Sequence, residues 1–474
     1  MLQNKIIRYF FIAFNLINSN FVYSEPWYSV DNQIIYLEIE QLRLCGVEVP
    51  ANSSFPLNIS IIDSAIKNSN HINSSEACQK ILYAFKTELE KNLFKTKNII
   101  GFQSKRPDIY FQDFKKRLLS DSNIYMSSSK SGRNYAYNLS LQVLPDNHRF
   151  DESYLSFYSN NHVFTVGRIS KWWSPSFNNS LILSNSARPS PGISFSNYKP
   201  VTMSNKYLSF LGPISYEFFL NKLERERHVP NALLFGNRIS IQPSHRLNIS
   251  LFRIAQLGGD GRNLDLKIFF DMFIGKDNYY STDTNKENEP GNQLGGLDFN
   301  YLFLKSKNLS LYGQIVGEDE AGYLPSKTFY TIGVRYAWNK PNLKVINFEY
   351  SDTGSRQENI TYNHSIYKSG YRYYGKPIGS VFDADSKILT FNYKQILKNN
   401  MYLYFKAAKA SLNYNNSVYF FINGLSDDLD LYEIDFNKRI LKTTDIKFTL
   451  QYSNFINVDT YDNLNASVSI EYRW

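Results

Sequence analysis

The chain has 474 residues, of which 43% are hydrophobic and 20% are charged. This hydrophobic content excludes a disordered chain, and the mean hydropathy of −0.38 excludes a bundle of membrane helices. The length exceeds that of one ordinary compact core but suits a large closed barrel with a smaller domain. The 36 Tyr and 35 Phe suit strands and membrane-interface girdles, although low-GC codon usage also raises both counts.

The N-terminus is typical of a secretory signal peptide. Lys5 and Arg8 form a basic start, a short apolar run follows over 9–17, and small residues surround Ser24. The run is shorter than the roughly 20 residues that a membrane-spanning helix needs. We therefore expect residues 1–24 to be a cleaved signal peptide and the mature chain to be exported.

The formal net charge of +9 falls by two, to +7, when Lys5 and Arg8 leave with the signal peptide. A positive exported protein can meet acidic polysaccharide or lipid phosphate, whereas nucleic acid is not expected as a partner in that compartment. Because no basic run concentrates the charge, the charge itself says little about partners.

The chain has two cysteines, Cys45 and Cys78. An even count in an oxidising compartment favours a disulfide between them. Two free buried thiols or a partial metal site are the alternatives, but no His ligands cluster nearby. We predict the Cys45–Cys78 disulfide, no metal site and no cofactor.

Apolar residues recur at helical spacing in the region before residue 130. The pattern predicts helices over 31–44, 56–66 and 76–94. We expect residues 25–130 to form a small α-helical domain on the periplasmic side. An amphipathic stripe of this kind is most often core, so we assign the helices no chemistry.

Beyond residue 130 the apolar period changes to two. From Leu464 to Trp474 every even position is apolar or aromatic, and every odd position is polar or charged. The charged face must meet water, while the apolar face meets either lipid or a protein core. The same alternation recurs over 297–303, 330–338, 432–436 and 446–452.

Two features favour a transmembrane barrel over a soluble β-sandwich, which shows the same alternation. The chain ends on an aromatic residue, Trp474, in the manner of strands that outer-membrane barrels present to the barrel-assembly machinery. The segment 463–474 is long enough to cross a membrane at a barrel's tilt. We therefore expect residues 131–474 to form an all-β transmembrane domain, a closed antiparallel barrel of roughly 16 to 20 strands in outer-membrane lipid.

Four irregular stretches between the strands carry distinctive sequence. The first runs over 167–175 and continues over 180–189, with the tandem Trp and the Leu-Ile-Leu-Ser-Asn-Ser-Ala-Arg-Pro run; the others are 258–262, 317–327 and 362–386. These stretches closely resemble, in the same order, the motifs of the capsule-assembly family known as Wzi. The resemblance covers nearly the whole mature chain. Ser174 and Phe55 depart from the residues that this family often has at those positions, which affects local loop detail.

The resemblance implies a barrel of about 18 strands, with a helical periplasmic domain and extracellular loops folded over the pore. It implies a surface lectin that attaches and orders exported capsular polysaccharide. It does not imply an enzyme or an open channel. We expect the protein to be a monomer.

The residues of these stretches also suit carbohydrate chemistry. Sugar sites use aromatic faces against C–H surfaces and planar polar groups against hydroxyls, and Arg pairs with the carboxylate of an acidic glycan. The alternative for each residue is packing of the loops inside the barrel. The candidate glycan-binding residues are Trp172, Trp173, Arg188, Tyr371, Arg372, Tyr373 and Tyr374.

Two other classes of function compete with a lectin. An enzyme would need a nucleophile beside a base, and the spacing of His364, Ser365 and Asp383 does not place one there, so we expect no catalytic residues. An outer-membrane porin or solute channel is the stronger alternative, because the inward-facing positions are polar. Ion conductance separates a porin from a lectin.

Overall fold

The structure is a computed structural model, in which the signal peptide predicted over 1–24 lies outside the described residues. The described residues are 27–30, 32–69, 75–92, 96–106, 111–115, 122–132, 134–262, 291–303, 308–318, 320–321, 324–325, 327–339, 342–355, 361–397, 401–416, 426–441, 443–456 and 464–474.

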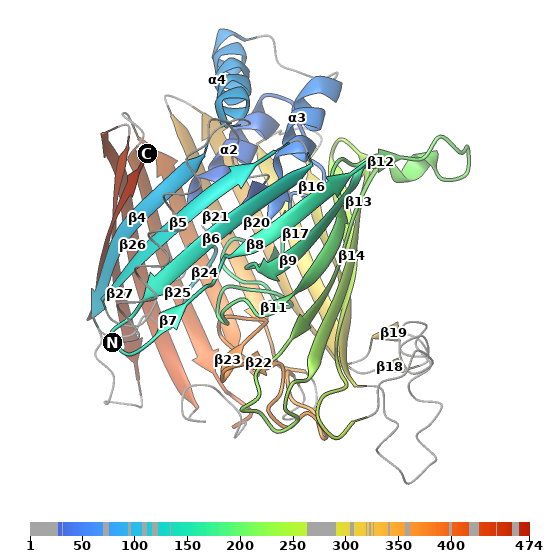
Figure 1. The fold of residues 1–474 in the computed structure, drawn as a ribbon, viewed down its shortest axis with the longest axis vertical. Coiled ribbons are helices and arrows are strands. Elements are labelled where there is room, and N and C mark those ends of the chain that lie inside the picture. Colours follow the sequence, from blue (N-terminus) through green and yellow to red (C-terminus); the bar gives the residue numbers. More distant parts are fainter. Residues whose placement is uncertain are drawn as a thin grey trace.

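A closed antiparallel β-barrel dominates the fold (Figure 1). β7 continues into β8 along β6, and β11 continues into β12 along β13, so the described wall has 18 strands. The last strand pairs with the first wall strand, β28 with β4, and closes the barrel. The wall consists of β4 (Lys97–Arg106), β5 (Asn123–Ser131), β6 (Tyr135–Val143), β7 (His148–Arg149), β8 (Tyr154–Ser159), β9 (His162–Arg168), β11 (Pro191–Asn197), β12 (Val201–Thr202), β13 (Pro213–Lys222), β14 (Leu233–Ser244), β15 (Leu247–Leu257), β16 (Asn292–Leu302), β17 (Leu309–Glu318), β20 (Thr328–Asn339), β21 (Leu343–Asp352), β24 (Lys387–Ile396), β25 (Met401–Leu412), β26 (Asp427–Leu441), β27 (Thr444–Phe455) and β28 (Leu464–Arg473).

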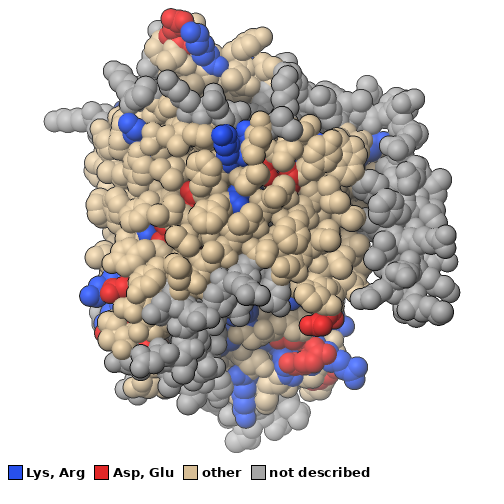
Figure 2. Space-filling model, turned by 90° about the vertical axis from the view of Figure 1, so that its left-hand side faces the viewer, with Lys and Arg blue, Asp and Glu red and all other residues tan. Residues whose placement is uncertain are grey.

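The alternation along the strands places apolar side chains outside and polar side chains inside. In β20, Ile332 is 44% exposed and Arg335 is 3% exposed; in β28, Ile470 is 43% exposed and Glu471 is 3% exposed. A soluble sandwich would bury the apolar face instead. The middle of the wall is accordingly mostly uncharged in Figure 2. This arrangement confirms the transmembrane barrel and answers the question that the alternation alone left open.

The barrel begins at Lys97, and the boundary predicted near residue 130 is wrong. β4 and β5 both belong to the wall, with Phe102 and Ile124 facing outward. Their alternation is weak because two isoleucines are adjacent in β4 and because Ser127–Ser129 in β5 puts small polar residues on both faces. The expected domains 25–130 and 131–474 therefore do not match the structure at this boundary.

Three helices occur near the predicted positions: α2 (Gln33–Leu44), α3 (Ile59–Asn68) and α4 (Glu76–Asn92). They gather at one end of the barrel (Figure 1), which we call the helical end; the opposite end is the loop end. Leu37 of α2 packs in one cluster with Ala337 and Val345 of the wall. The region is thus not a separate helical domain, because part of its core is shared with the barrel. We call residues 27–69 the plug.

Among the described residues, no helix combines the length and the apolar character that crossing a bilayer requires. Short elements complete the fold outside the wall. They are η1 (Ser209–Leu211) and the strand pairs β1 (Trp27–Tyr28) with β3 (Leu57–Asn58), β2 (Ser54–Phe55) with β10 (Trp172–Trp173), β18 (Glu320–Ala321) with β19 (Leu324–Pro325), and β22 (Arg372–Tyr373) with β23 (Lys376–Pro377).

Cys45 and Cys78, the pair expected from the sequence, form a disulfide in the structure. Cys45 caps the C-terminus of α2, and Cys78 lies in the first turn of α4. The bond therefore connects the plug to α4, whose outer face is exposed.

Replacing both cysteines with Ser should release α4 from the plug. The disulfide closes a loop across 33 positions, which the chain-entropy model values at about 3–4 kcal/mol. We expect trypsin to cleave α4 at a lower protease concentration in the double variant than in the parent protein. The barrel should keep its heat-modifiable migration on gels. Equal cleavage of the two proteins would contradict a stabilising role for the bond.

Candidate functional site

Residues 169–190 leave the wall after β9 and cross the lumen before β11; we call them the crossing segment. Its backbone is bonded to inward-facing side chains of several strands. The Leu181 N–H donates to Gln314 Oε1 of β17 at 2.8 Å, and Arg335 Nη2 of β20 donates to the Pro175 carbonyl at 2.7 Å. These bonds satisfy polar groups of the wall that face away from water.

The tandem tryptophans of the crossing segment are completely buried. Trp172 Nε1 donates to the Ser176 carbonyl at 2.9 Å, and Trp173 Nε1 donates to Glu217 of β13 at 3.2 Å. Trp172 also packs in the cluster of the plug, with Phe55. The two tryptophans form β10, which pairs with β2 of the plug, so both connect the crossing segment to the plug. Neither tryptophan presents a ring face to an external polymer.

A second segment, residues 361–386, folds into the lumen between β21 and β24; we call it the inner loop. The hydroxyls of Tyr362 and Tyr371 donate to the carbonyls of Leu181 and Ile182, each at 2.7 Å. These bonds join the inner loop to the crossing segment. The two segments share one buried apolar cluster, and the β22–β23 hairpin of the inner loop lies toward the loop end (Figure 1).

A third segment inside the lumen, residues 111–115, packs against the inner loop through Phe111 and Phe382, whose ring centroids are 4.9 Å apart. The Lys115 ammonium pairs with Glu433 and, at 3.3 Å, with Asp435, both on β26. The Lys115 carbonyl accepts from Asn185 Nδ2 of the crossing segment at 2.7 Å. Because a charge buried without a partner is very costly, this cluster holds the segment against the wall.

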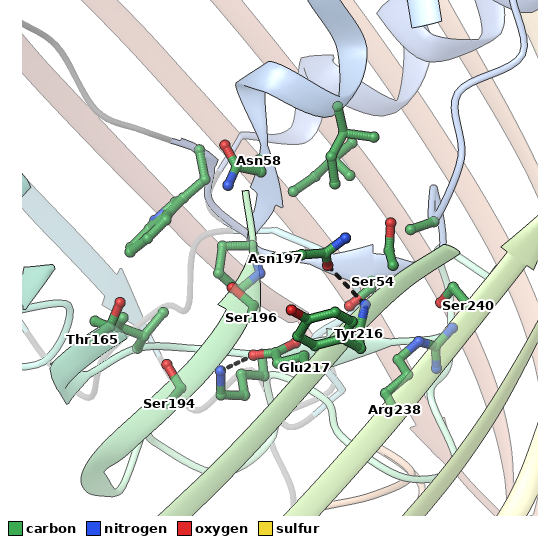
Figure 3. A pocket seen from close by; sticks show the side chains of 18 residues that line it. Ser54, Asn58, Thr165, Ser194, Ser196, Asn197, Tyr216, Glu217, Arg238 and Ser240 are labelled. Carbon is green, nitrogen blue, oxygen red and sulfur yellow. Dashed lines mark hydrogen bonds and ion pairs between the residues drawn. The ribbon is translucent and has the colours of Figure 1, made fainter. Parts of the chain in front are cut away.

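A small cavity lies between the plug and the wall near β13 and β14 (Figure 3). Its volume is about 60 Å³, which suits a few water molecules and falls far below the several hundred Å³ of typical ligand pockets. The Lys171 ammonium pairs with Glu217 on its border. Polar side chains lining the cavity include Ser54, Asn58, Thr165, Ser194, Ser196, Asn197, Ser215, Arg238 and Ser240.

An exposed aromatic residue stands at the tip of the β22–β23 hairpin. Tyr374 and Gly375 form the turn with φ values of 49° and 72°, and positive φ at both central residues is the geometry of a tight two-residue hairpin. Tyr374 is 54% exposed. At the base of the hairpin, Arg372 Nη2 pairs with Asp383 at 2.8 Å, which fixes the base in place.

Arg188 lies against this tyrosine. Its guanidinium carbon is 5.7 Å from the centre of the Tyr374 ring, and its side chain keeps 19% exposure. The buried Asp151 accepts from Arg188 Nη2 at 2.7 Å and from Nε at 3.2 Å. We call this arrangement the Tyr374–Arg188 pair.

The buried Tyr373 packs against the pair, with its ring centre 4.8 Å from that of Tyr374. Burial raises the pKa of the Tyr373 phenol, and the hydrogen-bonded Arg168 guanidinium offsets part of the rise. The phenol therefore stays neutral. Arg168 lies in the first distinctive stretch of the sequence but is not among the predicted glycan-binding residues, and no motif in the sequence pointed to Asp151.

The structure thus separates the predicted glycan-binding residues into two groups. Arg188 and Tyr374 are accessible from the loop end. The others are buried because their aromatic and guanidinium groups pack and hydrogen-bond the segments inside the lumen: Trp172, Trp173, Tyr371, Arg372 and Tyr373.

The residues considered for a catalytic triad have structural partners. Asp383 pairs with Arg372, and His364 Nδ1 accepts from the backbone N–H groups of Ile366 and Tyr367 at 3.2 and 3.3 Å. Both side chains thereby stabilise the inner loop.

Comparison with known proteins identifies the family. The family model described as Capsule assembly protein Wzi matches residues 104–468. A Klebsiella pneumoniae relative, the uncharacterized 55.8 kDa protein in the cps region, is 27% identical over 431 residues, covering 88% of this chain and 84% of the relative. The solved structure of Wzi from Escherichia coli, an outer membrane protein involved in group 1 capsule assembly and a carbohydrate binding β-barrel, is similar with a TM-score of 0.82. That match has 23% identity and covers 96% of this chain and 99% of the other. This chain belongs to the Wzi family of capsule assembly proteins.

Proposed function

We propose that this protein binds exported capsular or capsule-like polysaccharide and attaches and organises it at the cell surface. The observation that carries the proposal is the Tyr374–Arg188 pair, exposed at the loop end of a barrel whose lumen is occupied by its own chain. Membership of the family and the carbohydrate binding of the Escherichia coli protein support it.

The chemistry of the pair suits an acidic sugar. The exposed Tyr374 ring offers a flat apolar face to sugar C–H groups. Arg188 donates hydrogen bonds to Asp151 from Nε and from one N–H of Nη2. Its other guanidinium N–H groups can donate to a hydroxyl or a carboxylate of a sugar. Asp151 also fixes the guanidinium before a ligand arrives.

The lengths of the connections support an orientation with the loop end outside the cell. Bacterial outer-membrane barrels have short periplasmic turns and longer extracellular loops. The connections at the helical end include residues 160–161 and 245–246, whereas those at the loop end include 258–291 and 353–386. In this orientation α4 lies on the periplasmic side, the plug occupies the periplasmic end of the barrel, and the Tyr374–Arg188 pair faces the surface.

The occupied lumen favours a binding protein over a porin. The crossing segment and the inner loop are bonded to each other and to the wall, and the cavity of about 60 Å³ beside the plug suits water only.

Orientation can be tested with single engineered cysteines, since both native cysteines are in a disulfide. We expect Tyr374→Cys to react with a membrane-impermeant maleimide on intact cells. Tyr83→Cys, on the 74% exposed position of α4, should react only after the outer membrane is permeabilised. The reverse pattern of labelling would contradict the proposed orientation.

Polysaccharide binding can be tested by truncating the pair. Tyr374→Ser combined with Arg188→Gln should lower the cell-bound fraction of polysaccharide and raise the shed fraction, while total synthesis stays constant. Loss of one stacking contact worth about 1 kcal/mol corresponds to about a fivefold loss of affinity, so the double variant should exceed either single one. The measurement is binding of the host's own polymer to purified protein, alongside cell-bound and shed polymer in cells.

Tyr83→Ser is the matched control, because it removes another exposed tyrosine at the opposite end of the molecule. It should leave polymer retention at the level of the parent protein. If deletion of the whole protein leaves retention unchanged, and the purified protein conducts ions steadily in a planar bilayer, a porin function replaces the proposal.

A further inference from the structure

A loop with an unusual surface projects sideways from the barrel at the helical end, between β12 and β13 (Figure 1). We call residues 203–212, which include η1, the lateral loop. Four of its apolar side chains are exposed: Met203 at 39%, Tyr207 at 81%, Leu208 at 41% and Phe210 at 66%. Water contacts with side chains of this size are unfavourable, so this surface needs a partner.

The lateral loop is held against the end of the wall. Gly212 has a φ of 66°, and a Cβ at this position would lie 1.9 Å from the Gln242 carbonyl oxygen of β14. Asn205 contributes internal order, because its Oδ1 accepts from the Tyr207 N–H at 2.9 Å and its carbonyl accepts from the Ser209 N–H at 2.9 Å. The apolar side chains are therefore presented at a fixed level, where the outer face of the barrel ends.

The charged residues within the lateral loop and on either side of it in the sequence are basic. Between Tyr198 and Tyr216 the sequence contains Lys199 and Lys206 and no acidic residue. The adjacent turn between β14 and β15 adds Arg246. Aromatic residues beside lysines are typical of the membrane interface, where rings sit among the headgroups and ammonium groups meet lipid phosphates.

We propose that the lateral loop inserts into the lipid headgroup region of the leaflet on the helical side of the outer membrane. Tyr207, Leu208 and Phe210 contact the start of the acyl chains, and Lys206 binds lipid phosphate. A lipid partner fits better than a second copy of the chain, because a symmetric contact through this loop would bring lysines of the two copies together. The surface also continues the lipid-facing side of the wall.

Site-directed spin labelling tests this insertion in the full protein. A nitroxide is attached to Phe210→Cys, and the protein is reconstituted in vesicles of phosphatidylethanolamine and phosphatidylglycerol. Leu251→Cys on β15, 58% exposed toward lipid, and Tyr83→Cys on α4 provide the membrane and water references. Collision with oxygen, which concentrates in the bilayer, is compared with collision with a water-soluble nickel complex.

The label at position 210 should give an oxygen-to-nickel collision ratio several-fold above that of Tyr83→Cys and approaching that of Leu251→Cys. A ratio equal to that of Tyr83→Cys would overturn the proposal, because the loop would then lie in water. Low collision with both reagents, together with spin–spin broadening, would also overturn it and identify a second copy as the partner. Labels at Tyr207→Cys repeat the measurement if Phe210→Cys fails to assemble as a heat-modifiable barrel.

Discussion

The pairing of β28 with β4 is the constraint from which the rest of the structure follows. In a bilayer every backbone polar group of the wall needs a partner, and a closed sheet provides one without leaving an edge. Closure also turns one face of every strand inward, where lipid cannot cover it. The amphipathic strands therefore create a polar interior that must be filled with water or with protein.

This protein fills the interior with its own chain, and Arg335 shows how the filling is organised. One guanidinium donates to Glu40 of α2 at 2.9 Å and to the Pro175 carbonyl of the crossing segment at 2.7 Å. The ring of Phe177 lies 4.0 Å from the same guanidinium. A single wall residue thus forms hydrogen bonds to both the plug and the crossing segment, and so joins these two parts of the filling. The fork of donors on Arg makes such a three-way contact feasible, whereas Lys would offer only a point charge.

The strands were predictable because lipid on one side and polar protein on the other impose a period of two. The start of the barrel was not predictable from the sequence. The serines of β5 are polar on both faces, so no row of apolar residues indicates which face meets lipid. Trp172 and Trp173 were assigned to a binding surface because aromatic residues in a loop suit sugars, but the same rings also fill a lumen well. Sequence pattern cannot separate these uses when the loop folds inward. Tyr374 is the exception among these aromatic residues, because it stands with Gly375 at the tight turn of the β22–β23 hairpin and is exposed there.

Under the proposed function, the anchored base of the β22–β23 hairpin has a consequence for how a polymer is retained. Arg227 donates to the carbonyls of Gly370 and Arg372 at 3.1 and 3.0 Å, so the hairpin is ordered from below as well as through Asp383. A preorganised tip loses little conformational entropy when it binds, which lets a contact of modest strength succeed. A polysaccharide repeats its binding unit many times, and a cell surface displays many barrels. Each bound repeat raises the effective concentration of the next repeat at a neighbouring barrel. Many weak contacts along one polymer therefore give an overall affinity that a single contact does not reach.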